Sequence, residues 1–341
     1  MDSFIELFKD VGAFQCWHKH STFGEHLMGV WRIFQCWQLS QDLCRMALFH
    51  STYSNSWVSL TLFRPGADRG RLRAFIGTNA EELVHLMCSV PRMELTFQEI
   101  FTKGVPVEGI TVKDIRTGEP LVLTRRQVAI YTIFHIADWL DQNYGWQDDL
   151  FRNYNGIFEK PFLEILAGTF HENPGPLWPG EAKPGLYLSH LSILGKILRS
   201  CDQKDLIAPV FDNCTTVLPP ENEVKARDLY WEVVNNHGPV EQAATAQDKL
   251  ERVIKLNPFL GEPHAILAQI HIRRKHFKKA EEEALIALKL FNEFGTCWDK
   301  RLKWEAWVNW CRTVLIGARN EKWPETSMGM IGLGLVWDNT V

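Results

Sequence analysis

Apolar residues recur at the spacing of an α-helix through most of this 341-residue chain. In segment 25–39 they share one helical face: Leu27, Val30, Ile33, Phe34 and Trp37. The same spacing predicts further helices at 41–52, 79–91, 125–142 and 186–200, with Asn79 and Thr124 as expected N-caps. Residues 109–124 instead alternate apolar and polar side chains around a turn, which is typical of a β-hairpin. The sequence therefore predicts a mostly α-helical protein with one small β-hairpin.

Changes in composition divide the chain into segments. Pro, Gly and four Arg predict a basic loop at 64–73, and Pro and Gly predict a long ordered loop at 172–185. A stretch rich in Pro and Asn at 211–223 predicts a linker. This linker would join a helical domain at 1–210 to a C-terminal tail at 224–341.

The tail contains an internal repeat. A shift of 34 residues pairs Val233 with Leu267 and Ala246 with Ala280. A helix–turn–helix period of this length resembles the tetratricopeptide repeat, in which small residues let two helices approach and large ones fill the groove between them. In the unit that fits this pattern more closely, the small and large positions are Leu267, Ala268, Ala280, Ala287 and Leu288. A last unit at 295–319 carries Trp304, Trp307 and Trp310 at helical spacing and is expected to close the array.

Charge and composition exclude two classes of partner. The formal net charge is −4, which argues against a protein that grips nucleic acid by charge alone. No run approaches ~18 apolar residues, so no membrane-spanning helix is expected. The eight cysteines form no Cys-x-x-Cys pair, and no export signal is apparent at the N-terminus. We therefore expect reduced, mostly buried cysteines and a cytoplasmic or organelle-stromal protein.

Three polar residues lie within apolar helical faces, where an unpaired polar side chain is costly. They are His26 in GEHLMGVW, His50 in MALFHST and Asp138 in HIADWL. Buried groups of these types are most easily satisfied together. The sequence leaves two arrangements open, a hydrogen-bonded cluster and a site for a divalent metal such as Mn, Fe, Zn or Mg.

The order of these residues resembles the HD superfamily of metal-dependent phosphohydrolases, and most nearly the hydrolase domain of (p)ppGpp synthetase/hydrolase enzymes. That resemblance covers roughly residues 15–145 and implies an HD-like helical bundle in which His26, His50 and Asp138 bind one divalent metal. A family known only as a domain of unknown function, with His-Ser in place of His-Asp, is more similar still. Some of its plant-type members carry a tetratricopeptide-like tail.

The chain departs from the HD pattern next to His50. Ser51 replaces the Asp of the doublet, and Tyr53, Ser54 and Asn55 stand where the (p)ppGpp hydrolases carry an acidic pair. A neutral hydroxyl binds a hard cation far more weakly than a carboxylate does. We expect Ser51, Tyr53 and Asn55 to lie around the pocket, and His135, one turn before Asp138, to be a neighbour of the site.

Three functions remain open at this stage. The first is a metal-dependent hydrolase of a small anionic substrate, phosphorylated or nucleotide-like, which Arg69, Arg71 and Arg73 would orient. The second is a mononuclear non-haem iron oxygenase, because two His and one carboxylate are also the ligands of that class. The third is a non-catalytic scaffold whose tail binds a partner protein.

A cationic patch in the tail bears on the third function. It consists of Arg273, Arg274, Lys275, Lys278 and Lys279. The patch would face a partner or dock on the N-terminal domain.

Overall fold

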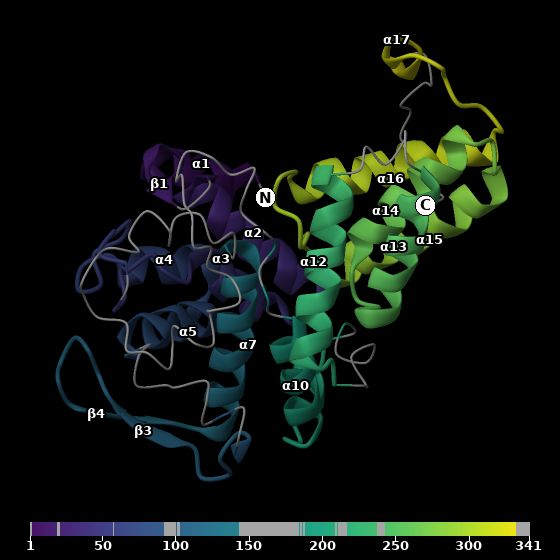
Figure 1. Ribbon diagram of the computed structural model, residues 1–341. Coiled ribbons are helices and arrows are strands. Elements are labelled where there is room, and N and C mark those ends of the chain that lie inside the picture. Colours follow the sequence, from purple (N-terminus) through teal and green to yellow (C-terminus); the bar gives the residue numbers. More distant parts are fainter. Residues whose placement is uncertain are drawn as a thin grey trace. The chain divides into compact units, whose positions relative to one another are not determined.

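The computed structural model describes most of the chain: residues 2–18, 21–56, 58–91, 100, 103–142, 184, 186, 188–208, 210, 217–236 and 243–331. Its contacts divide the chain into two compact units. The first unit comprises Met1–Asn143 with His190–Val217, and the second comprises Tyr144–Ser189 with Leu218–Val341. The described residues are mostly helical, as predicted (Figure 1). The loop predicted at 172–185 lies almost wholly outside the described residues.

The first unit is a helical bundle with short strands. Its helices are α1 (Asp2–Asp10), α2 (Phe23–Cys36), α3 (Gln41–Phe49), α4 (Arg69–Ile76), α5 (Thr78–Ser89), α7 (Arg125–Gln142) and most of α10 (Leu188–Arg199), with 3₁₀ turns η1 (Ala13–Gln15) and η3 (Lys204–Leu206). Helix α2 packs against α3 and α7, and α5 packs against α3 and α4. Every residue of α7 from Val128 to Asp141 is buried, so this helix is the centre of the bundle.

Side-chain caps fix the starts of the helices that carry the site. Thr22 and Glu25 form a capping box at the start of α2, and Ser40 caps α3. At α7 the predicted cap is confirmed, because Thr124 and Gln127 bond to each other's backbone N–H groups.

The predicted hairpin is present as β3 (Ile110–Lys113) and β4 (Pro120–Leu123), paired antiparallel. A second antiparallel pair, β1 (Trp17–His18) with β2 (Ser21–Thr22), was not predicted. Its strands of two residues are too short to produce a periodic signal in the sequence.

Two other local predictions are wrong. The expected basic loop at 64–73 contains the start of α4 at Arg69, and α5 begins after Gly77 instead of at an Asn79 cap. Gly77 has φ +93°, a conformation that glycine adopts without strain, so the chain can turn sharply between the two helices.

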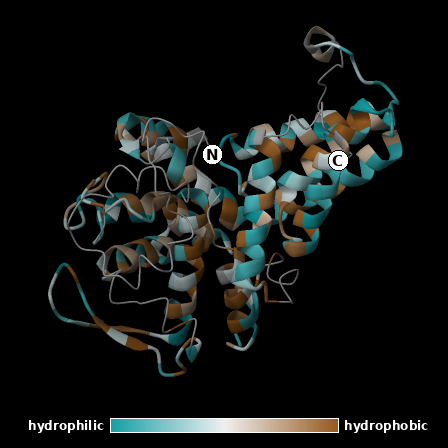
Figure 2. Cartoon of the chain, viewed as in Figure 1, coloured by the Kyte–Doolittle hydropathy of each residue, from teal (hydrophilic) through white to brown (hydrophobic). Residues whose placement is uncertain are grey.

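The second unit is an array of helices: α12 (Pro220–Asn236), α13 (Ala243–Leu256), α14 (Gly261–Arg273), α15 (Phe277–Phe294), α16 (Trp304–Arg319) and α17 (Ser327–Ile331). From α12 to α16 each helix packs on the next. Helix α12 begins inside the segment 211–223 that the sequence predicts as a linker. Figure 2 shows apolar and polar residues on different sides of these helices, as their spacing predicts.

Alanines form the contact between α14 and α15. Ala265 and Ala268 on α14 and Ala280, Ala284 and Ala287 on α15 are all buried in one apolar cluster. Trp307 belongs to the same cluster, and Trp304 and Trp310 pack against it, so the tryptophan stripe is part of the core. Side chains this small allow the two helix backbones to approach closely.

Two other expectations concern the whole chain. None of the described cysteines forms a disulfide. Cys16 and Cys36 are half-buried, and the buried ones are Cys44, Cys88, Cys201, Cys297 and Cys311. Within the described segments no helix is both long enough and apolar enough to cross a membrane.

A buried carboxyl joins α14 to the turn that precedes α16. Glu262 is 1% exposed and accepts the backbone N–H groups of Trp298 (2.5 Å) and Asp299 (3.0 Å). Asp299 in turn accepts the hydroxyl of Tyr230 on α12 and pairs with Arg301. Burial raises the pKa of Glu262 to about 7, although the backbone donors oppose this shift.

We predict that Glu262 makes stability depend on pH. Its folded-state pKa lies above the usual 4.5, so its contribution is fully present below pH 4.5 and is lost as the pH rises through about 7. The loss amounts to roughly 3 kcal/mol at most. Urea unfolding of wild type and Glu262→Gln near pH 5 and pH 8 measures it.

The Glu262→Gln variant should not lose stability in this way as the pH rises, because an amide does not titrate. Glu282→Gln, which changes an exposed carboxyl on α15, is the matched control and should keep the wild-type slope. An unchanged pH dependence in Glu262→Gln contradicts the prediction.

Candidate metal centre

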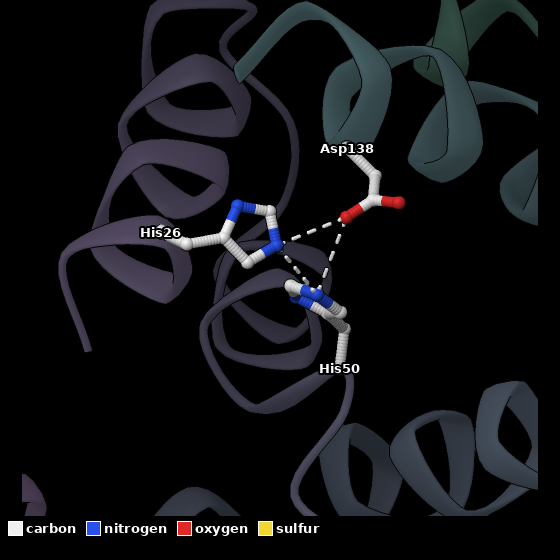
Figure 3. A group of neighbouring side chains, drawn as sticks. All are labelled: His26, His50 and Asp138. Atoms are coloured by element: carbon white, nitrogen blue, oxygen red, sulfur yellow. Dashed lines mark hydrogen bonds and ion pairs between the residues drawn. The ribbon is translucent and has the colours of Figure 1, made fainter. Parts of the chain in front are cut away.

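Three elements bring the predicted trio together. His26 comes from α2, His50 is the C-cap of α3, and Asp138 comes from the last part of α7 (Figure 3). His26 Nε2 lies 3.1 Å from Asp138 Oδ1 and 3.3 Å from His50 Nε2, and His50 Nε2 lies 3.4 Å from Asp138 Oδ1. Ligands at ~2.0–2.2 Å from one ion lie roughly 3–4 Å apart, so these three atoms have the spacing of a shared coordination sphere.

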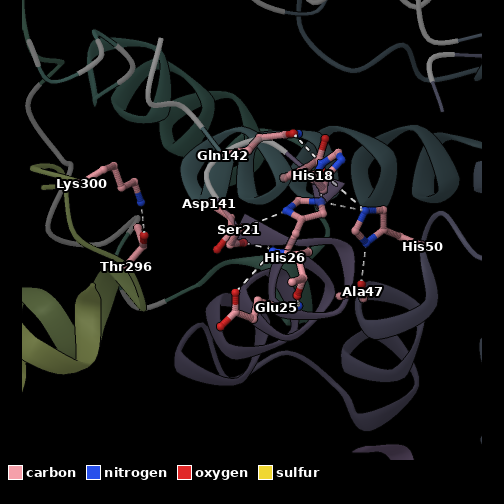
Figure 4. A network of polar contacts seen from close by, with 12 residues as sticks. His18, Ser21, Glu25, His26, Ala47, His50, Asp141, Gln142, Thr296 and Lys300 are labelled. Atoms are coloured by element: carbon pink, nitrogen blue, oxygen red, sulfur yellow. Dashed lines mark hydrogen bonds and ion pairs between the residues drawn. The ribbon is translucent and has the colours of Figure 1, made fainter. Parts of the chain in front are cut away.

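In both imidazoles of the trio, Nδ1 forms a hydrogen bond with a group outside the trio. His50 Nδ1 donates to the carbonyl oxygen of Ala47 at 2.7 Å, and His26 Nδ1 donates to Asp141 Oδ2 at 2.8 Å (Figure 4). Both contacts turn Nε2 towards Asp138. A hydrogen bond at one ring nitrogen fixes the tautomer and leaves the other nitrogen to bind a metal or a proton.

The centre is buried and carries negative charge. His26, His50 and Asp138 are 4%, 1% and 1% exposed, and Asp141 is 8% exposed. Burial disfavours the charged form of His26, but its contacts with Asp138 and Asp141 outweigh burial and raise its pKa to about 9. The two carboxylates therefore favour the protonated form of His26.

Asp141 and Gly29 are site residues that the sequence analysis missed. A Cβ atom built on Gly29 would lie 1.9 Å from Asp141 Oδ1, so only glycine lets α2 come this close to the carboxylate. Asp138 and Asp141 are three residues apart on one helix, which places both on one face. That spacing was the available signal, whereas nothing in the sequence indicates that Gly29 meets Asp141.

A further contact lies beside His26. His18 Nε2 is 3.3 Å from Gln142 Oε1, and the His18 ring lies 4.6 Å from the His26 ring (Figure 4). Phe134 packs against the His50 ring at 4.8 Å. The imidazoles of the trio therefore sit among other rings, which restricts their rotation.

The residues expected around the pocket form their own hydrogen bonds. Ser51 Oγ accepts from Asn55 Nδ2 at 2.9 Å, and both residues are buried. Tyr53 donates its hydroxyl to Glu81 at 2.9 Å. His135 is fully buried on α7, with its ring 5.7 Å from the Trp139 ring.

Two of the three candidate substrate-binding arginines are engaged by a buried carboxylate. Glu81 is fully buried and accepts from Arg69 Nε and Arg73 Nε, both at 2.7 Å. Burial raises the pKa of Glu81, but bonds from Arg69, Arg73 and Tyr53 outweigh it and lower the pKa overall. Arg71 instead lies over the Phe63 ring. The ion pairs join α4 to α5, and an anion-binding role for these arginines stays a prediction.

The β-hairpin supports the segment after His50. Arg116, in the hairpin turn, donates Nη2 to the carbonyl oxygens of Tyr53 (2.6 Å) and Ser54 (3.0 Å). Cys88 on α5 donates its thiol to the carbonyl oxygen of His50. Contacts from two distant parts of the chain thus hold the end of α3, where His50 lies.

A family model described as a domain of unknown function (DUF6817) matches residues 7–92, which include His26 and His50 but not Asp138. No curated protein matches the chain. No solved structure matches it either.

We predict that Gly29→Ala disrupts the centre. The new methyl group must push Asp141 away from His26, which leaves a buried polar pair unsatisfied and should lower stability by about 2 kcal/mol or more. Gly70→Ala on α4 is the matched control, since a Cβ there meets nothing within 4 Å. It should leave stability unchanged or raise it by up to about 1 kcal/mol through helix propensity.

Urea unfolding of both variants measures the difference. Equal stabilities of Gly29→Ala and Gly70→Ala would show that the close approach of Asp141 to α2 is unimportant.

Proposed function

We propose that the first unit is a metal-binding domain that holds one divalent cation through His26 Nε2, His50 Nε2 and Asp138 Oδ1. The observation that carries the proposal is the convergence of these three atoms at 3.1–3.4 Å, with both Nδ1 atoms engaged elsewhere. The three residues are also a group whose ligand atoms all lie within 4.8 Å of one another. Imidazole nitrogen and carboxylate oxygen are common ligands of Zn, Mn and Fe.

Charge balance supports the same proposal. Asp138 and Asp141 are buried carboxylates on either side of His26. A divalent cation would neutralise both of them and would take the place of the proton on His26 Nε2. Asp141 would then hold His26 in the orientation that ligation requires.

The chemistry that we propose for the domain is hydrolysis of a small anionic substrate, phosphorylated or nucleotide-like. Three protein ligands leave coordination positions open, and a bound cation supplies Lewis acidity and an acidified water there. The order of the three residues, which resembles that of HD phosphohydrolases, favours this substrate class. Ser51 in place of a carboxylate favours one ion over a pair, because a hydroxyl does not bridge two metals.

The central prediction concerns metal binding. Protein purified after growth in metal-replete medium should contain about one equivalent of a divalent metal, measured by elemental analysis. Asp138→Asn should lower metal affinity by roughly 100-fold in a calorimetric titration because it removes an anionic ligand. Asp248→Asn, which changes an exposed carboxyl on α13 of the second unit, should bind metal like the wild type.

The identity of the bound metal also distinguishes the hydrolase, the oxygenase and the non-catalytic scaffold. Bound Mn, Zn or Mg with release of phosphate from nucleotides would support the hydrolase. Bound Fe with substrate-dependent oxygen consumption would support the oxygenase, which uses the same residues. Absence of binding to folded wild-type protein at micromolar metal would overturn the proposal and favour the scaffold.

A further inference from the structure

A groove in the second unit carries an inference independent of the metal centre. Its volume is about 640 Å³. One wall is the end of α14, the following turn and the start of α15, and the other is the segment after α16. The lining residues are Ile272, Arg273, Lys275, Phe277, Glu321, Lys322, Trp323, Pro324 and Glu325.

The floor of the groove is apolar and continuous with the core. Ile272 is buried, whereas Phe277 and Trp323 are half-buried and pack against the alanine-rich cluster. A Cβ on Gly317 of α16 would lie 3.0 Å from the Trp323 ring and 3.2 Å from Ile272. This close fit fixes the position of the floor, so its apolar surface is present before any ligand arrives.

The rim carries three cationic residues and two exposed acids, Glu321 and Glu325. Arg273, Lys275 and Lys322 are exposed, and among the described residues none of them makes an ion pair or a side-chain hydrogen bond. Some other surface arginines are paired, as Arg126 is with Asp205 and Arg319 with Glu281. Three exposed cations that make no ion pair among the described residues therefore border the apolar groove, and they outnumber the two acids that line it.

Two residues of the rim adopt the left-handed backbone region where the helices end. Lys275 has φ +59°, in the left-handed region where a residue other than glycine costs about 1 kcal/mol. Glu321, on the opposite wall, has φ +50°.

We propose that this groove binds an acidic peptide segment of a partner protein. One apolar side chain of the peptide would rest on Ile272, Phe277 and Trp323, and flanking carboxylates would meet the cationic rim. Nucleic acid fits less well because Glu321 and Glu325 also line the groove and would repel a continuous phosphate backbone. A peptide can avoid them by its sequence.

The test measures binding of labelled peptides to the full chain by fluorescence anisotropy. The peptides have about nine residues, with one Phe, Leu or Trp flanked by Asp and Glu. At least one of them should bind with a micromolar Kd that weakens as salt is raised. Replacing its apolar residue by Ser should also weaken binding.

Arg273→Glu with Lys322→Glu should weaken binding by about tenfold or more, because two attractive charges become repulsive. Both changes are at exposed positions, and circular dichroism verifies that the fold is kept. The matched control, Arg252→Glu with Lys255→Glu, makes the same charge change on exposed positions of α13 and should bind like the wild type.

Three results would overturn the proposal. The first is that no peptide binds with a Kd below about 1 mM. The second is equal binding by the groove variant and the wild type. The third is a different occupant, shown by tighter binding of a single-stranded oligonucleotide or by a dimer in sedimentation that the groove variant abolishes.

Discussion

The contact of His26 with two carboxylates of α7 is the interaction on which the first unit depends. Asp138 meets its Nε2 and Asp141 meets its Nδ1, all below 10% exposure. Separating His26 from either carboxylate would leave a buried charge without its partner, so the contact holds α2 and α7 in one register. Gly29 is required for the same reason, since any larger residue there would occupy the space of Asp141. The residues of the candidate metal centre therefore also determine how α2 packs against α7.

The helices of the second unit pack mainly through small apolar side chains. Alanines allow close contact between α14 and α15, and Glu262 and Asp299 form a buried polar network with Tyr230. The groove beside Trp323 lies at the open edge of this core. The two units therefore differ in their polar residues. The first unit buries groups that can bind an ion, and the second unit exposes unpaired cations beside an apolar surface.

The sequence predicted much of the local structure for identifiable reasons. Residues 125–142 are a helix with the predicted bounds because apolar spacing and the Thr124 cap act within a few residues. The start of α4 was missed because Pro and Gly precede it, and because its Arg69 and Arg73 are held by Glu81 from another helix. At the site, too, the sequence does not reveal contacts between different helices. His26, His50 and Asp138 could be selected as polar residues on apolar faces, but the pairing of His26 with Asp141 depends on how α2 meets α7.

The sequence by itself determined the helical class, the hairpin at 109–124 and the three residues that had to be satisfied together. These follow from periodicity, turn chemistry and the cost of burying a polar group, which are properties of short segments. The tertiary structure decided which nitrogen of each imidazole faces the centre. It also decided that Arg69 and Arg73 form ion pairs with Glu81. It also decided that Lys275 and Lys322 border one groove. Each of these depends on contacts between residues far apart in the chain, whose distances are set only when the helices pack.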